Sequence, residues 1–148
     1  MSTITFDQKS NLSLSKLVAF GVIAGLAGGM VFGMIMAMMG MLPMVAMLVG
    51  QESAIVGFIV HMMISAFIGA VYGVVVGQLP LTTTFAFIVG VVNGIVWWVL
   101  GALILMPLML GMSQMVFVIG ADQWMSLLGH IIYGLVTAFV FLPLAKCL

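Results

Sequence analysis

Long apolar runs dominate the chain, and short polar or proline-containing segments separate them. The runs predict four helical spans, over residues 17–39, 53–77, 84–106 and 123–144. Each span is as long as the ~18–20 apolar residues that cross the hydrocarbon core of a bilayer. The apolar positions are continuous rather than alternating, which argues against transmembrane β-strands. The pattern therefore predicts an all-α polytopic membrane protein with four transmembrane helices.

The two halves of the chain repeat one arrangement. Each half has a glycine-spaced span, then a proline in a methionine-rich stretch, then a Gly-x-acid triplet at residues 50–52 or 120–122, and finally a second span. Because each half has two spans, the halves share one orientation and are expected to be related by an axis near the membrane normal. We predict one membrane domain made of two tandem hairpins, residues 17–77 and 84–144, after a polar cytoplasmic tail over residues 1–16.

Pro43 and Pro107 interrupt the long apolar runs. The run from Leu17 to Val49 is too long for one straight span, and proline breaks or kinks a helix because it lacks a backbone donor. We expect the residues after each proline to form a short interfacial or re-entrant helix that protein shields from lipid.

Composition agrees with this class. The chain has 148 residues, of which 66% are hydrophobic and 4% charged, whereas soluble domains carry about 25% charged residues. The first apolar segment is longer than the core of a cleavable signal peptide. The net charge is zero, so nothing indicates a nucleic-acid partner. The single cysteine, Cys147, makes no intrachain disulfide.

The few charges predict the orientation. Lys9, Lys16 and Lys146 fall on one side of the predicted spans, and Glu52 and Asp122 fall on the other. Lysine bias sets orientation, so we expect a multi-pass protein of the cytoplasmic (inner) membrane with both termini cytoplasmic. The two carboxylates begin the second and fourth spans, where the helix dipole favours them. Helix capping accounts for them without a catalytic role.

Two histidines are the main candidate for a functional site. His61 and His130 lie at matching places in the second and fourth spans, roughly 10–13 Å along each helix from its start. An ionisable side chain inside the membrane is costly and is read as functional by default. Both histidines belong to rows of small residues, so we expect them to face other helices.

Those rows predict where helices pack closely. Small residues recur every four positions, which lets helix backbones approach each other as in a glycine zipper. The predicted packing positions are Gly21, Gly25, Gly29, Gly33, Ser65, Gly69, Gly73, Gly90, Gly94 and Gly134.

Three interpretations of the histidines stay open. In the first, each forms an interhelical hydrogen bond, which is modest in energy at ~0.6–2 kcal/mol. In the second, His61 and His130 together hold one haem b as axial ligands. Their placement resembles that of cytochrome b-type membrane proteins, although those carry two histidines on each ligand helix. The hydrogen-bond partners expected in the first interpretation are a backbone carbonyl, Asn93, Tyr72, Tyr133 or Ser65.

The third interpretation is copper. The chain has 16 methionines, and thioethers are soft ligands that suit Cu(I). Its M-x-x-x-M and G-x-x-x-G elements resemble those of small copper transporters, whose layout lacks the four spans and the repeat. Methionine is also a flexible apolar filler beside glycine. The candidate ligands are Met34, Met38, Met41, Met44, Met109 and Met112.

Several activities are excluded by what the spans lack. None of the four predicted spans contains Asp, Glu, Lys or Arg, which ion-coupled transporters generally need. No G-x-S-x-G or H-E-x-x-H motif supports hydrolysis, so we expect no enzyme. By elimination, the sequence favours a structural or accessory subunit of a membrane assembly or a homo-oligomer. The alternative is a haem- or copper-binding four-helix bundle.

The second half also resembles a group of small four-span prokaryotic membrane proteins. The resemblance lies in Trp97-Trp98, Met106-Pro107, Gly111 and the stretch over residues 130–134, with its His-x-x-Tyr-Gly element. In the first half, His61 is followed by residues that depart from that element. The resemblance implies the four-span topology and gives no reaction.

Overall fold

A computed structural model describes residues 12–79 and 82–147. Four helices of the described chain are long and apolar enough to cross a membrane, which confirms the predicted spans to within a few residues. Most of the predicted polar tail, with Lys9, and the loop residue Pro80 lie outside the described residues. The spans are α1 (Leu14–Met38), α3 (Ala54–Val76), the continuous run Thr83–Met109, and α6 (Ala121–Lys146).

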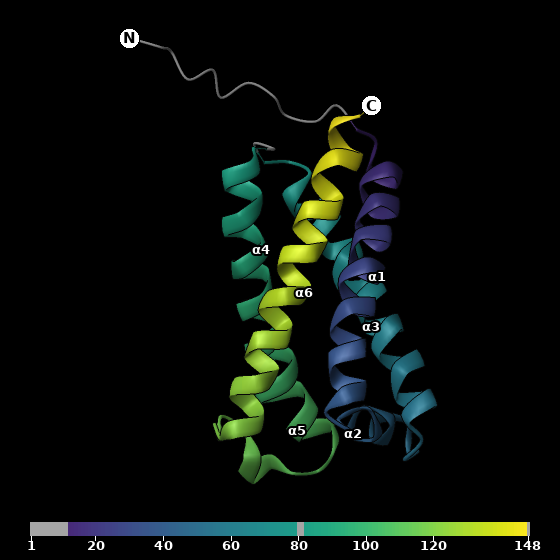
Figure 1. The fold of residues 1–148 in the computed structure, drawn as a ribbon, viewed down its shortest axis with the longest axis vertical. Coiled ribbons are helices and arrows are strands. Elements are labelled where there is room, and N and C mark those ends of the chain that lie inside the picture. The colour runs from purple at the N-terminus through teal and green to yellow at the C-terminus, as the bar shows by residue number, and fades with distance from the viewer. Residues whose placement is uncertain (1–11, 80–81, 148) are drawn as a thin grey trace.

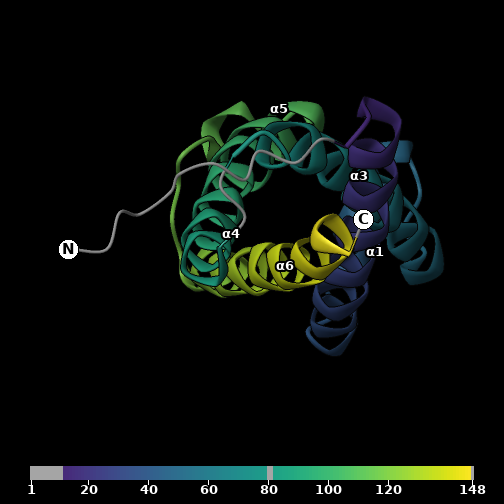
Figure 2. The ribbon, with the colours of Figure 1, turned by 90° about the horizontal axis from the view of Figure 1, so that it is seen from above.

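Each half of the chain folds as a helical hairpin. In the first hairpin α1 packs along α3, and in the second α4 (Thr83–Trp97) packs along α6. The hairpins join through α1 and α6, so the spatial order is α3, α1, α6, α4 (Figures 1 and 2). The two outer helices, α3 and α4, barely contact each other. The bundle therefore has one incompletely closed side.

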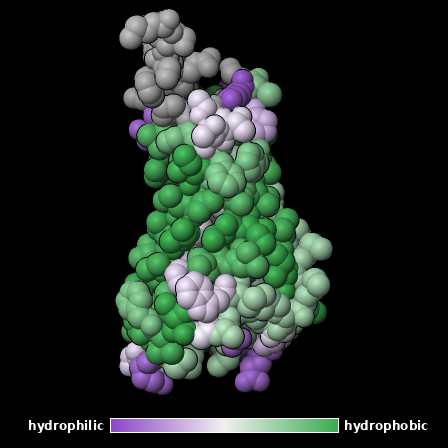
Figure 3. All heavy atoms as spheres, turned by 60° about the vertical axis from the view of Figure 1, so that its left-hand side comes forward, coloured by the Kyte–Doolittle hydropathy of each residue, from purple (hydrophilic) through white to green (hydrophobic). Residues whose placement is uncertain are grey.

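Polar residues gather at the two ends of the bundle. Lys16 lies in the first turn of α1 and Lys146 in the last turn of α6, and these helix ends lie together (Figure 1). Asp122 lies in the first turn of α6 at the opposite end, where Glu52 precedes α3. Figure 3 shows a broad hydrophobic band between the hydrophilic ends. This distribution is that of an integral membrane protein.

Glycines lie where the helices of each hairpin meet. A Cβ added at Gly21 would clash with the carbonyl group of Gly69, and one at Gly73 with the carbonyl oxygen of Leu17. Gly94 lies in the same way against the backbone of His130. Any larger residue there would force the two backbones apart. All ten predicted packing residues lie on helix faces turned toward another helix of the chain. Besides Gly21, Gly69, Gly73 and Gly94, they are Gly25, Gly29, Gly33, Ser65, Gly90 and Gly134.

The contact between the hairpins uses two glycines that the four-residue rows did not single out. Gly28 of α1 lies against Tyr133 and Thr137 of α6. Gly129 of α6 lies under the ring of Phe32, so close that a Cβ there would overlap the ring. Phe32 is therefore held at the junction of α1 and α6.

The first proline begins a separate short helix, as expected. After α1 ends, Gly40 adopts a left-handed conformation (φ 68°), and the Met41 amide donates to the Met36 carbonyl at 2.9 Å. This geometry terminates the helix. Pro43 then lies at the start of α2 (Leu42–Ala46), which packs on α3 and continues into a 3₁₀ turn, η1 (Met47–Val49).

The second proline acts differently, and the expectation of a separate helix after it was wrong. The span widens into a π-helix, η2 (Trp98–Leu105), and runs on through Pro107 in α5 (Met106–Met109). Because Pro107 has no N–H, it gives the Leu103 carbonyl no α-helical partner. The amide of Phe117 donates to that carbonyl at 3.2 Å. The loop after α5, which includes the 3₁₀ turn η3 (Ser113–Met115), is thereby tied back to the span.

Candidate functional site

A cavity of about 430 Å³ lies between the two hairpins, in the half of the bundle that contains α2 and α5. All four spans contribute to its wall, including the π-helix. Most of the lining is apolar, and the volume falls within the range of small-molecule sites. The polar side chains that line it are His61, Ser65, Ser126, His130 and Tyr133. Both candidate histidines therefore belong to one cavity.

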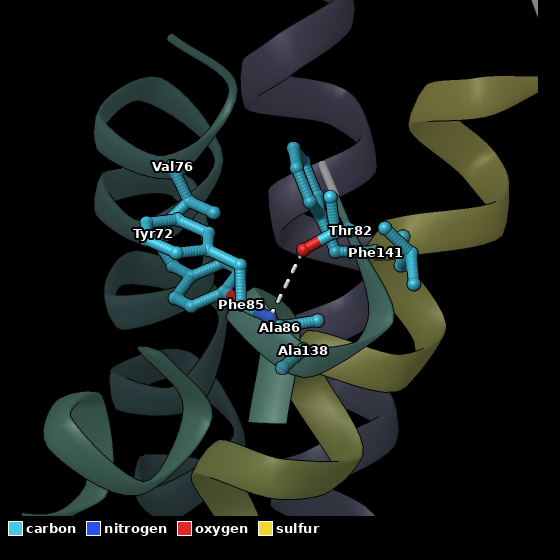
Figure 4. A pocket seen from close by; sticks show the side chains of 8 residues that line it. Tyr72, Val76, Thr82, Phe85, Ala86, Ala138 and Phe141 are labelled. Carbon is cyan, nitrogen blue, oxygen red and sulfur yellow. Dashed lines mark hydrogen bonds between the residues drawn. The ribbon is translucent and has the colours of Figure 1, made fainter. Parts of the chain in front are cut away.

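The opposite half of the bundle is packed shut. Figure 4 shows Tyr72 and Val76 of α3, Phe85 and Ala86 of α4, and Phe141 of α6 around a concavity there. It leaves no room for a water molecule. The rings of Tyr72 and Phe141 meet edge-on at 5.5 Å between centroids. Of these two hollows, the one that carries the histidines has space for a ligand.

The π-helix forms part of the cavity wall. Gly101 of η2 lines it, and a Cβ added at Gly101 would meet no atom within 4 Å. This glycine differs from those between the helices because it faces open space. π-Helical turns occur frequently at functional sites. Trp98 links the π-helix to α6, since its indole N–H donates to the Gln123 carbonyl at 3.0 Å.

His61 links the two helices of the first hairpin. Its Nε2 donates to the carbonyl oxygen of Gly29 on α1 at 3.0 Å, and the side chain is buried. The partner is a backbone carbonyl on another helix, which is one of the partners that the sequence indicated. The imidazole also contacts the ring of Phe32 edge-on, with 5.4 Å between centroids.

His130 forms its hydrogen bond within its own helix. Its Nδ1 donates to the Ser126 carbonyl at 2.7 Å, and the Ser126 hydroxyl lies 3.3 Å from the same nitrogen. The expected interhelical bond is therefore not formed by this residue. Its ring contacts Phe32 at 4.9 Å between centroids. Phe32 thus bridges the two imidazoles.

The hydrogen bonds define which nitrogen of each ring carries the proton. A carbonyl oxygen only accepts, so His61 must be protonated at Nε2 and His130 at Nδ1. In a neutral imidazole the other nitrogen carries a lone pair. No group of the described chain donates a hydrogen bond to His61 Nδ1 or His130 Nε2. Each histidine therefore offers an unused acceptor.

The two histidines do not fit a haem held between them. Axial ligation by both rings would place one iron and its macrocycle between the two nitrogens. The ring of Phe32 contacts both imidazoles, and the Nε2 atom of His61 is already bonded to Gly29.

The six candidate methionines do not form one cluster. Met41, Met44 and Met109 line the cavity. Met34 and Met38 lie on the outer surface of α1, where Met38 is 87% exposed. Met112 lies beyond α5 and does not line the cavity. Two methionines that were not among the candidate ligands, Met36 and Met106, also line it. Within residues 12–79 and 82–147, no group of three His, Cys, Asp or Glu side chains is placed to hold a metal.

The features that sequence reasoning missed are those that shape the cavity. Nothing in the spacing singled out Phe32 as the residue between the histidines, or Gly129 as the position that makes room for it. Gly101 and Pro107 were signals that the third span is irregular. Their effect, a π-helix beside the cavity, was not predicted.

No protein-family model matches the chain, and no curated protein or solved structure matches it either. The resemblance of the second half to small four-span prokaryotic proteins accordingly stays a prediction. A functional assignment for this four-span protein rests on the chemistry of its cavity.

Proposed function

We propose that this integral membrane protein holds a small lipid-soluble molecule in the cavity between its hairpins. The observation that carries the proposal is the cavity of about 430 Å³, which is apolar except for one group of histidine, serine and tyrosine side chains. A concave apolar site with a few convergent polar groups is the usual form of a small-molecule site.

The incompletely closed side of the bundle supplies the entry route. α3 and α4 barely contact each other, so a molecule dissolved in the bilayer can reach the cavity between them. One ring pair spans this side, where Phe67 of α3 and Trp97 of α4 meet edge-on at 6.3 Å between centroids. Both residues line the cavity. We assign them as the residues that a ligand passes.

Blocking the cavity tests the proposal. In Gly101→Phe the new ring enters the open space in front of Gly101. Leu100→Phe is the matched control, because Leu100 is 43% exposed and does not line the cavity. Native mass spectrometry of the purified proteins is expected to find one bound small molecule per chain in wild type and Leu100→Phe, and none in Gly101→Phe. Equal retention by all three proteins would contradict the proposal.

Copper is an alternative occupant of the same cavity. Thioethers of Met36, Met41 and Met44 share the cavity with two imidazoles that each have an unused lone pair. Such ligands suit Cu(I). If copper is the occupant, metal analysis after Cu(I) loading gives one ion per chain, and Met41→Leu with Met44→Leu abolishes it. The pair Met34→Leu and Met38→Leu, on the outer surface, leaves loading unchanged.

An accessory role in a membrane assembly, or self-association, is the second candidate function. The outer face of α3 favours it, because Ile55, Ile59 and Met63 are exposed along one stripe. The packing glycines are occupied within the chain and do not supply a contact surface. Replacing Ile59 and Met63 by Trp should release a partner subunit or separate an oligomer during gentle detergent purification. A protein that stays monomeric and without partners before and after the change argues against this role.

A further inference from the structure

The polar groups of the cavity restrict the chemistry of its ligand. No Lys, Arg, Asp or Glu of the described residues lines it. A carboxylate or phosphate would therefore lie in an apolar site without a counter-charge, which is costly. The ligand that fits is neutral.

The histidines of the cavity favour a ligand that donates hydrogen bonds. The proton of the Tyr133 hydroxyl is already used, because it is donated to the Ser65 carbonyl at 2.9 Å. His61 Nδ1 and His130 Nε2 can only accept, since the other nitrogen of each ring donates to a backbone carbonyl. A bound molecule with hydroxyl groups satisfies these acceptors, whereas a pure hydrocarbon leaves them unpaired.

The size and the walls of the cavity favour an aromatic ligand. A cavity of about 150 Å³ is sufficient to bind benzene, so the volume of about 430 Å³ accommodates a substituted ring with part of a tail. Rings of Phe32, Phe67 and Trp97 line it. Aromatic pairs gain energy beyond the area they bury.

We propose that the cavity binds a lipid-soluble phenol or quinol whose hydroxyl groups donate to the unused nitrogens of His61 and His130. This inference rests on the proposed function, because it names the class of the molecule held there. It involves binding alone and no chemical step. It also assigns a role to the pairing of the histidines, since both rings line one cavity and each has an unused acceptor nitrogen.

Two probes that differ by one methyl group test the inference. The full chain in lipid nanodiscs is titrated with 4-hexylphenol and with its methyl ether, 4-hexylanisole, by calorimetry. The ether has the same ring and tail but no donor. We expect one phenol per chain, bound about tenfold more tightly than the ether, as expected when a hydrogen bond in an apolar site is lost.

Two variants displace the acceptors from the positions of the ring nitrogens and keep the structural hydrogen bonds. In His61→Gln the amide nitrogen replaces Nε2 and still donates to Gly29. In His130→Asn the amide nitrogen replaces Nδ1 and still donates to Ser126. The ring lone pairs are absent from both variants, and each amide oxygen lies on the same carbon as the donating nitrogen, away from the position of the lost ring nitrogen. The preference for the phenol over the ether is therefore expected to fall to less than about twofold in the double variant. Gly101→Phe should bind neither probe.

The outcomes separate this inference from the proposed function. If wild type binds the phenol and the ether equally and Gly101→Phe binds neither, the cavity is a site but its preference for donors is refuted. The same holds if the preference survives in the double variant. If wild type binds neither probe up to the solubility of each, both the proposed function and this inference are overturned.

Discussion

Tyr133 donates its hydroxyl proton to the carbonyl oxygen of Ser65 at 2.9 Å, and this bond joins α6 of the second hairpin to α3 of the first. Both residues line the cavity and both are buried. α3 and α6 are otherwise separated by α1 in the order of the bundle. The bond therefore ties the outer helix of the first hairpin to the second hairpin beside the site.

Tyr133→Phe removes this bond and keeps the ring. We expect the free energy of unfolding to fall by about 1 kcal/mol, the usual net value of one hydrogen bond, as measured by denaturation in bicelles. Tyr72→Phe is the control, because the Tyr72 ring is buried on α3 but no hydrogen bond is formed by its hydroxyl within the described chain. Equal losses in the two variants would show that the bond contributes nothing specific.

Gly129→Ala tests the position that makes room for Phe32. The new methyl group would overlap the phenyl ring, so the ring has to move away from both histidines. We expect a loss of about 1–3 kcal/mol, as for other overpacked interiors. Gly101→Ala provides the opposite case, because its methyl group meets nothing. In a helix this change stabilises by up to about 1 kcal/mol. If both variants have wild-type stability, the close contact at Gly129 is not as described.

Pro107→Ala tests the link between the third span and the loop after α5. The restored amide at residue 107 can donate to the Leu103 carbonyl, which now accepts from Phe117. We expect Phe117 to lose its partner and its amide to exchange at least about tenfold faster with deuterium, as local opening becomes easier. An unchanged exchange rate at Phe117 would mean that the proline does not maintain this bond.

Cys147 reports the orientation of the chain. It is the only cysteine and its side chain is exposed just after α6. With the lysine-bearing ends cytoplasmic, a membrane-impermeant maleimide should leave intact cells unlabelled and should label inverted vesicles. A Cys147→Ser chain that carries a new cysteine at Gln51, at the opposite end, is expected to give the reverse pattern. Labelling of Cys147 in intact cells would contradict the predicted orientation.

The sequence predicted the spans and the interior placement of the histidines for a simple reason. The length of a continuous apolar run indicates whether a helix can cross a bilayer. Small residues at regular spacing indicate which face of that helix packs against another helix. His61 illustrates this, since its neighbours at four-residue spacing, Gly57 and Ser65, lie on a packed face of α3. Its bond to a backbone carbonyl on another helix was among the expected partners.

The cavity was not predictable in the same way. Spacing along one helix says nothing about how far apart two outer helices stand, and this distance decides whether α3 and α4 enclose space. The contacts of Phe32 with both imidazoles depend on the crossing of three helices. The bond of His130 to Ser126 also competes with interhelical partners, because the carbonyl one turn earlier in the same helix lies within reach of its side chain.

The open space in front of Gly101 allows the size of the bound molecule to be measured by substitutions at this one position. A Cβ there meets no atom within 4 Å, so side chains of increasing size at this position take up increasing volumes of the site. A series from Ala through Val and Leu to Phe would exclude bound molecules in order of their size. The first substitution that excludes the natural occupant would measure its bulk before that molecule is identified.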